Sequence, residues 1–261
     1  MLIVKKELLY LLIFLLVPFN LFSEMNGDPG EIYPIKINKN VNSYLVVENK
    51  GVRYALIPLP FDKQGKSIKF NGKEININKK DFGESRITIA NTSMVDLNEK
   101  DSIRASEEAK IINKALKIYT LKYKPKLNFI KPVDGIISSR YGKKRYINGS
   151  PRSPHLSLDI AAPSGTNIVA PEYGKVILIG DFFYAGNYII LDHGYGLLTS
   201  YSHLSKVDVS INQIINKGQK IGEVGSSGRV TGPHLHWTVY LNKTRINPES
   251  LLDGKFLESI P

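Results

Sequence analysis

The chain contains no cysteine among its 261 residues, and this absence excludes several kinds of chemistry at once. There can be no thiol nucleophile, no cysteine-ligated zinc ion, no iron–sulfur cluster and no lipid-modified cysteine. Three familiar signatures of catalytic or phosphate-binding sites are also missing. The sequence has no His-Glu-x-x-His helix and no Gly-x-Ser-x-Gly elbow, and the glycine-rich segment 225–229 lacks the Gly-Lys-Ser/Thr ending of a phosphate loop. These routes to catalysis are therefore closed.

The apolar run at the start of the chain is too short to span a bilayer comfortably, which takes about 20 residues. It extends from residue 8 to residue 17 and follows a basic pair, Lys5 and Lys6. This arrangement predicts a secretory signal peptide over residues 1–23, and hence an exported protein of the periplasm or cell envelope. The residues before Ser23 are not the small ones expected at a cleavage site, so an uncleaved membrane anchor is the alternative.

Long runs of basic residues are absent as well, although the formal net charge is +11. Cleavage after Ser23 would leave a net charge of +10, because two lysines and one glutamate are removed. Such a charge favours approach to polyanions. The longest basic cluster of the folded part, residues 143–145, is too short to define a stripe for nucleic acid. We therefore expect association with an anionic cell envelope and no binding of nucleic acid.

Histidine is scarce, with five residues in the whole chain, yet four of the five have a suggestive placement. His155 precedes Asp159 by four residues, and His234 and His236 are separated by two. Side chains two or four residues apart on a strand project from the same face, so each pair can face a common point. His203 follows in a Tyr-Ser-His sequence, whereas a structural role is expected for His193 beside a glycine-rich turn. Converging imidazole and carboxylate groups are what a transition-metal hydrolase needs.

The residues around these histidines extend the pattern over roughly residues 128 to 252. The matching segments are Ile136, Ser138, Arg140 and Gly142, then His155 and Leu158 through Pro163, Gly174-Lys175-Val176, Tyr201 through Ser205, and Gly225, Gly228 and Thr231 through His236. In this order they resemble the lysostaphin-like (LytM-type) zinc metallopeptidases. The resemblance implies an antiparallel β-sheet domain that cleaves peptide bonds of bacterial peptidoglycan.

The same resemblance implies a role for each residue of the motif. His155, Asp159 and His236 would hold Zn2+, and His203 and His234 would act on the attacking water, one as general base and the other on the oxyanion. Two neutral imidazoles and one carboxylate leave the ion with a net charge near +1, enough to lower the pKa of a coordinated water toward roughly 7. One position departs from the family: Ser157 stands where glycine is usual, and it could crowd the ion or hydrogen-bond a neighbouring group.

The amino-terminal part of the sequence predicts a second, smaller β domain. Five short segments have the composition of strands: 43–47, 52–59, 68–70, 75–77 and 86–90. Asn71-Gly72 between two of them is a strong signal for a type I′ hairpin. The spacing favours a small, immunoglobulin-like β-sandwich.

A helix is expected between this β domain and the peptidase. Apolar residues recur at three- and four-residue steps from Ala105 to Tyr119, and Asp101 or Ser102 could cap the start. We expect the helix to pack on the sandwich rather than join the domains or cover the active-site groove. The predicted fold is therefore mainly β, in five parts: signal peptide or anchor 1–23, β-rich domain 24–97, helix and linker 98–127, metallopeptidase domain 128–252, and carboxy-terminal tail 253–261.

Substrate contacts are expected from three loops that the family topology places around the metal, residues 140–154, 181–187 and 225–233. These loops carry the candidate contacts to stem-peptide carboxylates: Arg145, Arg152, Tyr184 and Arg229. The resemblance favours a DD-endopeptidase that cuts D-alanyl-diaminopimelate cross-links. The alternative is a catalytically silent wall-binding module or amidase activator. Silent relatives usually lack a metal ligand and this chain retains all of them, which favours the enzyme.

Overall fold

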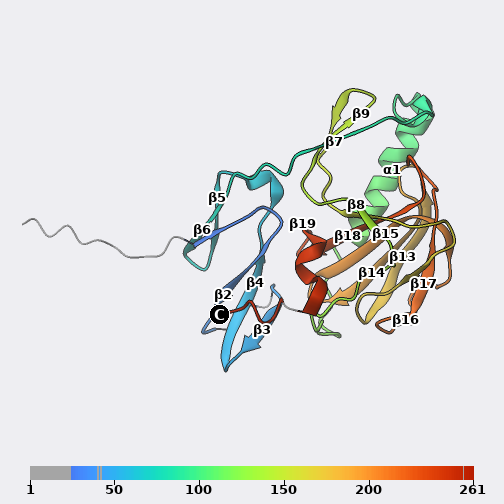
Figure 1. The fold of residues 1–261 in the computed structure, drawn as a ribbon. Coiled ribbons are helices and arrows are strands. Elements are labelled where there is room, and N and C mark those ends of the chain that lie inside the picture. The colour runs from blue at the N-terminus through green and yellow to red at the C-terminus, as the bar shows by residue number, and fades with distance from the viewer. Residues whose placement is uncertain (1–24, 40, 42, 255) are drawn as a thin grey trace, which may run out of the picture.

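The computed structural model describes residues 25–39, 41, 43–254 and 256–261. The amino-terminal strands form a small lobe, and the long strands of the second half form a large sheet beside it (Figure 1). The predicted signal peptide or anchor, residues 1–23, lies outside the described residues. Within the described ranges, none of the helices combines the length and the apolar character needed to cross a bilayer.

The small lobe consists of two three-stranded sheets. One has the order β2-β4-β3 and the other the order β1-β6-β5. Their bounds are β1 Met25–Gly27, β2 Ile32–Lys36, β3 Val46–Asn49, β4 Val52–Pro58, β5 Ser67–Phe70 and β6 Lys73–Ile77. Asn71 and Gly72 both have positive φ, at 47° and 75°, as the predicted hairpin turn between β5 and β6 requires. The immunoglobulin-like arrangement is not confirmed, because β1 pairs with β6 in parallel.

The fifth predicted strand of the small lobe lies elsewhere, and its assignment to the sandwich is wrong. The strand β7, Glu84–Ile87, pairs in parallel with β9, Lys144–Ile147, of the second half of the chain. The strand β10, Ser150–Arg152, completes this separate three-stranded sheet. The sequence pattern of β7 shows that it is a strand, but alternation alone does not specify which strand it joins.

The helix α1 extends over Glu99–Ala115, and two of its predicted features are wrong. Its amino-terminal cap is Asn98, whose side-chain oxygen accepts a hydrogen bond from the Asp101 amide at 2.9 Å, so Asp101 already lies in the first turn. The helix packs on the large sheet rather than on the small lobe, because Ile112, Ala115 and Leu116 contact an apolar cluster there that includes Phe182 and Tyr188.

The large sheet has ten strands, all paired antiparallel, which confirms the predicted mainly β, antiparallel peptidase domain. The seven strands of its main path have the order β16-β13-β14-β15-β18-β11-β8, and β12, β17 and β19 pair at its margins. Their bounds are β8 Ile136–Ser139, β11 Leu158–Ala161, β12 Asn167–Val169, β13 Gly174–Phe182, β14 Gly186–Gly194, β15 Leu197–Val207, β16 Ile214–Ile215, β17 Lys220–Val224, β18 His234–Leu241 and β19 Thr244–Ile246. Three short 3-10 helices are η1 Phe61–Lys63, η2 Thr92–Met94 and η3 Pro248–Gly254.

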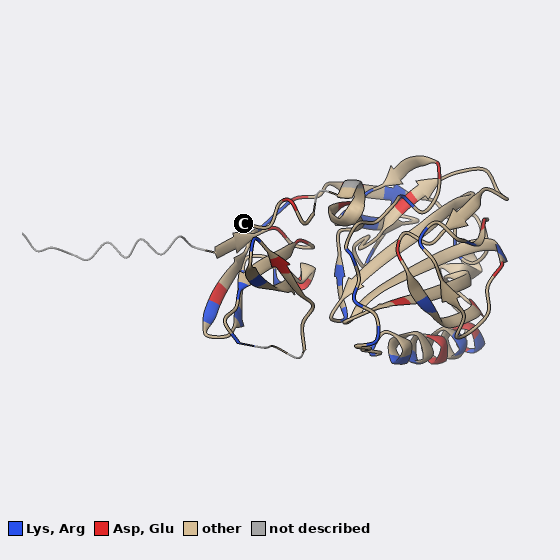
Figure 2. Ribbon diagram, turned by 90° about the horizontal axis from the view of Figure 1, so that it is seen from below, with Lys and Arg blue, Asp and Glu red and all other residues tan. Residues whose placement is uncertain are grey.

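The two lobes share one hydrophobic core. Buried residues of the small lobe, among them Leu45 and Leu56, belong to the same cluster as Trp237 and Leu158 of the large sheet. The end of the chain returns to the small lobe, where the Asn49 side chain donates a hydrogen bond to the Ile260 carbonyl at 2.8 Å (Figure 1). The predicted carboxy-terminal tail is therefore packed between the lobes. Basic and acidic residues are distributed along the chain in both lobes (Figure 2).

His193 belongs to this core and not to the functional site. Its side chain is fully buried, with Nδ1 donating to the Tyr173 carbonyl at 2.8 Å and Nε2 lying 2.7 Å from the Thr199 hydroxyl. This is the structural environment expected from the sequence. Burial lowers the pKa of His193 from its ordinary value of 6.5 to about 4.

The buried imidazole of His193 predicts a loss of stability in mild acid. As the pH falls from 6.5 to about 4, the unfolded chain binds a proton on this ring that the folded chain does not. The free energy of unfolding should therefore decrease by about 3 kcal/mol through this window, and the contribution is fully present above pH 6.5. Urea unfolding at neutral pH and in mild acid measures the difference. His193→Gln, which cannot titrate, should show a correspondingly smaller pH dependence; an equal dependence in both proteins would contradict this origin.

Candidate functional site

The floor of the candidate site is formed by two neighbouring antiparallel strands, β11 and β18, of the large sheet, and β11 lies next to the edge strand β8. In the pairing of β11 with β18, Asp159 lies directly opposite His236. Directly opposed residues share a face, and His234 joins them because it lies two residues before His236 on the same strand. The sequence alternation therefore brings three of the predicted residues together without any loop.

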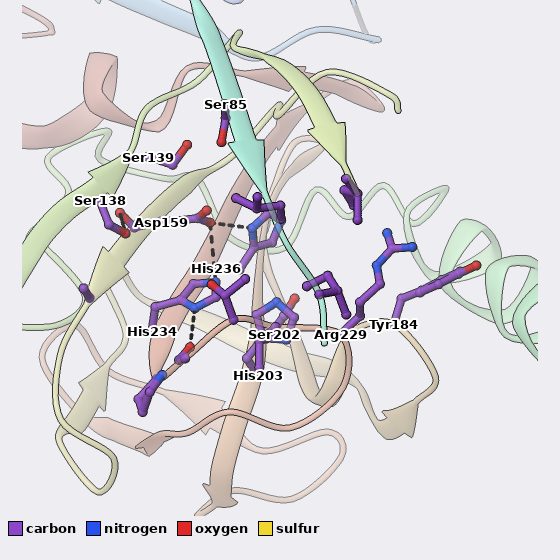
Figure 3. A pocket seen from close by; sticks show the side chains of 18 of the residues that line it. Ser85, Ser138, Ser139, Asp159, Tyr184, Ser202, His203, Arg229, His234 and His236 are labelled. Atoms are coloured by element: carbon purple, nitrogen blue, oxygen red, sulfur yellow. Dashed lines mark hydrogen bonds and ion pairs between the residues drawn. The ribbon is translucent and has the colours of Figure 1, made fainter. Parts of the chain in front are cut away.

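Asp159 is the centre of the cluster (Figure 3). Its Oδ1 atom lies 2.6 Å from His236 Nδ1, 2.9 Å from His155 Nε2 and 4.0 Å from His234 Nε2. The two ring nitrogens that face it, His155 Nε2 and His236 Nδ1, are 3.3 Å apart. The three predicted metal ligands thus present one nitrogen or oxygen atom each to a common point, with all three atoms within 4.8 Å of one another.

His155 reaches this point from a loop, not from a strand as the parity argument assumed, because β11 begins at Leu158. The backbone on both sides of it is fixed by hydrogen bonds: its amide donates to the Lys143 carbonyl at 2.9 Å and its carbonyl accepts from the Gly142 amide at 2.7 Å. The His155 ring is oriented by the Arg140 carbonyl, which accepts from Nδ1 at 3.0 Å. This bond leaves Nε2 of the neutral ring as a lone pair aimed at Asp159.

His203 is brought to the site by an irregularity in β15. The β14–β15 register slips between Ile189 and Asn187, so that β15 carries an extra residue before Leu204. His203 itself has a φ of 66°, in the left-handed region that non-glycine residues rarely adopt. Without this bulge, alternation would place His203 on the same face as the fully buried Tyr201, away from His236.

His203 and His234 face each other next to the three-residue cluster, with ring centroids 4.9 Å apart. Each donates its Nδ1–H to a backbone carbonyl at 2.9 Å, His203 to Ser227 and His234 to Gly232. A carbonyl can only accept, so the Nε2 atom of each neutral ring is an unprotonated base. Both residues line the cavity described below.

Burial controls the charge of the site. It lowers the pKa of His236 to about 4 and that of His203 to about 3, with neighbouring histidines adding to the shift at His203. Burial alone would raise the pKa of Asp159, but its interactions with His236 and His155 lower it well below the usual range. At neutral pH Asp159 is therefore a carboxylate and the rings of His203 and His236 are neutral, the protonation states that a metal ligand or a general base requires.

The donor set fits a divalent transition metal. When the His155 ring is neutral, its Nε2 atom and Asp159 Oδ1 both present lone pairs, and no hydrogen atom lies between them. At a separation of 2.9 Å these two atoms repel each other. A cation between them and His236 Nδ1 would relieve this repulsion. Two imidazoles and one carboxylate form a ligand set of the kind found at catalytic zinc, which keeps a further coordination position open.

The cluster opens into a cavity of about 460 Å3. Three of the four predicted substrate contacts, Arg145, Tyr184 and Arg229, line it. Arg229 stacks on the Tyr184 ring at 4.1 Å. Arg152 does not line the cavity; it lies exposed on β10, directly across from Arg145.

Ser157, the departure from the family pattern, is accommodated away from the cavity. It is 3% exposed, and its hydroxyl lies 2.7 Å from that of Thr238 on β18. Of the two effects expected from this hydroxymethyl group, the structure shows the hydrogen bond to a neighbour.

The sequence reasoning missed one set of residues at the site. Ser85, Ile87 and Ile89, from β7 and the residues after it, line the same cavity as the histidines (Figure 3). Their alternating spacing marks one face of a strand, but nothing local indicates that this face meets the active site.

An open cavity with clustered histidines and one carboxylate, on an antiparallel sheet, is typical of a metallohydrolase. Residues 153–248 match the model of peptidase family M23. A solved structure from Pseudomonas aeruginosa, described as a peptidase M23, is 30% identical, with a TM-score of 0.67 over 86% of this chain and 93% of that chain. The chain belongs to peptidase family M23, and the predicted class, a zinc metallopeptidase, is confirmed at the level of the family.

Curated relatives carry more specific names. The peptidoglycan DD-endopeptidase ShyA of Vibrio cholerae is 40% identical over 119 residues, which cover 44% of this chain and 28% of that protein. The DD-carboxypeptidase/endopeptidase Mpg of Neisseria meningitidis serogroup B is 38% identical over 97 residues, 37% of this chain and 22% of that protein. The chain thus spans less than a third of the length of these relatives.

Proposed function

We propose that this protein is an exported zinc endopeptidase that hydrolyses the peptide cross-links of bacterial peptidoglycan, with D-alanyl-diaminopimelate bonds as the substrate. The observation that carries the proposal is the convergence of Asp159 with His155 and His236, beside two further histidines in one open cavity. The names of the V. cholerae and N. meningitidis relatives support the choice of substrate.

In this proposal His155, Asp159 and His236 hold the metal through Nε2, Oδ1 and Nδ1, the atoms that already converge. Bound Zn2+ supplies a Lewis acid that activates water and polarises the scissile carbonyl. The protein keeps the ligand atoms in place: the Arg140 carbonyl holds the His155 ring, and strand pairing holds Asp159 opposite His236.

His203 and His234 handle the protons. The Nε2 atom of one ring accepts the proton of the attacking water, whereas the other ring, in the form that carries a proton on Nε2, donates a hydrogen bond to the oxyanion that develops on the carbonyl oxygen. The carbonyls of Ser227 and Gly232 accept from the Nδ1 atoms and so fix the orientation of both rings, and the ring that acts as the base has its Nε2 lone pair free without reorienting. The burial that lowers the pKa of His203 also keeps its ring unprotonated at neutral pH, as a general base requires.

The substrate would be held by cationic side chains at the cavity. Arg145 lines it and is largely buried, which lowers its pKa. Among the described residues it has no hydrogen bond or salt bridge, so its guanidinium is available to a carboxylate of the stem peptide. Arg229, stacked on Tyr184, would supply a second contact.

Replacing Arg145 with glutamine should raise the Michaelis constant about 10- to 100-fold and leave kcat within a few-fold, because a charge-assisted hydrogen bond contributes about 1.5–3 kcal/mol. Steady-state kinetics on purified muropeptide dimers would measure this change. Arg152→Gln is the matched control, since Arg152 lies across from Arg145 on the same hairpin but outside the cavity. Equal Michaelis constants in the two variants would remove Arg145 as a substrate contact.

Export would place the enzyme with its substrate in the periplasm or envelope. The basic sequence, with a net charge of +11, would favour retention near anionic envelope polymers. Amino-terminal sequencing of protein recovered from the envelope would show whether residues 1–23 are removed or retained as an anchor.

Muropeptide analysis of purified sacculi incubated with the zinc-loaded protein tests the proposed function. We expect dimeric muropeptides to decrease, without new reducing sugars, and a chelator to prevent the change. New reducing ends would indicate a glycosidase. Binding to sacculi without any change in muropeptides would instead support the silent wall-binding module.

A further inference from the structure

The catalytic cavity has a side that lies outside the family-matched region. β7 begins at Glu84, well before residue 153, where the family match starts. Its parallel pairing with β9 brings it to the cavity, whose lining includes Ser85 together with Ser139 and Asp159 (Figure 3). The residues after β7 are also held there, because the Asn148 side chain accepts from the Ile89 amide at 2.8 Å and donates to its carbonyl at 3.1 Å.

The two paired strands present different chemistry on their two faces. Arg86 stacks over the Tyr146 ring at 4.0 Å and is exposed, so this pair marks the face directed away from the cavity. The alternate residues line the cavity in two cross-strand pairs: Ser85 opposite Arg145, and Ile87 opposite Ile147.

The inner face therefore combines a polar, cationic end with an apolar end. The two pairs are separated by two residues along the strand, or about 6.6 Å, which is roughly the length of an extended four- or five-carbon chain. Ile89, which is 4% exposed, continues the apolar end. Such a surface complements a side chain with an aliphatic stem and a terminal carboxylate.

We propose that β7 is a substrate-binding wall of the catalytic cleft, in which Ile87 contacts the aliphatic stem of a substrate side chain whose carboxylate is bound by Arg145. This inference rests on the proposed endopeptidase function and adds a specificity-determining residue to it. It also gives the amino-terminal part of the chain a direct role at the active site.

The first test is steady-state cleavage of a purified diaminopimelate-containing muropeptide dimer by the full-length, zinc-loaded protein. Ile87→Ala should raise the Michaelis constant about tenfold while kcat stays within about twofold, because the lost contact is with a part of the substrate that does not react. Thr88→Ala is the matched control: Thr88 is the next residue along the chain and is exposed, and its variant should behave as wild type.

A second variant acts on the same wall without altering an apolar contact. Asn148→Ala removes both side-chain hydrogen bonds to Ile89 and should also raise the Michaelis constant. Thermal unfolding of both variants checks that the protein remains folded. An unchanged Michaelis constant in folded Ile87→Ala protein would overturn the proposal. A higher kcat/KM in either variant would overturn it as well, because β7 would then obstruct the cleft.

Amidation of the substrate carboxylate separates the two ends of the wall. In the wild type and in Ile87→Ala, amidation should weaken binding of the dimer by the same factor. In Arg145→Gln, the amidated and the unmodified dimer should bind equally well. If amidation did not weaken binding to Ile87→Ala, the stem and the carboxylate would not have separate contacts, and this part of the proposal would be contradicted.

Failure of the proposed function can be told apart from failure of the wall. If the wild type cleaves the dimer and Ile87→Ala matches it, the function holds and the wall does not. If the wild type cleaves nothing, the contribution of Ile87 to substrate binding can still be measured. Calorimetric titration of the same dimer into His234→Ala and into His234→Ala/Ile87→Ala gives the two affinities, and we expect about tenfold weaker binding to the double variant. Equal affinity, or no binding to either protein, would then reject the wall.

Discussion

Asp159→Asn is expected to lose both the bound zinc and the peptidase activity. Asp159 Oδ1 is the one anionic atom in the ligand cluster, and it lies within 3 Å of both ligand nitrogens. An amide presents a weaker oxygen donor, or a competing N–H, and leaves the divalent charge without compensation. Removing the activation that the metal provides costs several kcal/mol, so we expect kcat/KM to fall by at least about a thousandfold.

Zinc content after gel filtration, measured by mass spectrometry, and loss of muropeptide dimers would be followed in parallel. The matched control is Asp208→Asn, the same chemical change at a carboxylate that pairs with Lys206 and Lys220 outside the cavity. It should keep one equivalent of zinc and full activity, because Asp208 lies outside the cavity and ion pairs near the surface contribute little. An Asp159→Asn protein that binds zinc as tightly as the wild type would exclude this carboxylate as a ligand.

The site was largely predictable where strand alternation determines geometry. The two-residue spacing of His234 and His236 was enough to place both on one face of β18, and the antiparallel pairing with β11 then brings Asp159 opposite His236. Turn chemistry was equally predictive: the Asn71-Gly72 turn was placed correctly, because a type I′ hairpin needs residues that tolerate positive φ.

Prediction failed where the outcome depends on partners distant in sequence. The alternation of Ser85, Ile87 and Ile89 indicates a strand, but its pairing with β9 depends on an edge that only the folded second half of the chain provides. The apolar stripe of α1 likewise specifies a buried face without specifying the large sheet as its partner. His155 was grouped with Asp159 for an incomplete reason, since it reaches the proposed metal site from a loop held by backbone hydrogen bonds.

The position of His203 is the clearest case of geometry that alternation does not give. An extra residue in β15 and a φ of 66° turn this ring from the core face to the cavity. A left-handed conformation costs a non-glycine residue roughly 1–2 kcal/mol, and such strain is characteristic of functional sites. Here it has a specific consequence: it brings His203 Nε2 next to the metal-ligand cluster while Nδ1 remains bonded to the Ser227 carbonyl.

His203→Ala should therefore keep zinc and lose turnover. The ring contributes no atom to the Asp159-centred ligand cluster, so metal content should equal that of the wild type. Removing a general base or an oxyanion contact should lower kcat by about 10²- to 10⁴-fold with little change in the Michaelis constant. Dimer cleavage and zinc content are the measurements, and His193→Gln, which changes a histidine outside the cavity, should retain activity.

His203→Gly separates the catalytic loss from backbone strain. Glycine accepts the positive φ at this position without steric cost, so His203→Gly should be about 1 kcal/mol more stable than His203→Ala. Because both variants lack the imidazole, both should be equally inactive, and added imidazole should restore part of the activity in each. If His203→Ala lost its zinc, His203 would instead be a ligand, in the alternative cluster that it can form with His234 and His236. If His203→Gly alone recovered activity, the ring would serve only to shape the bulge.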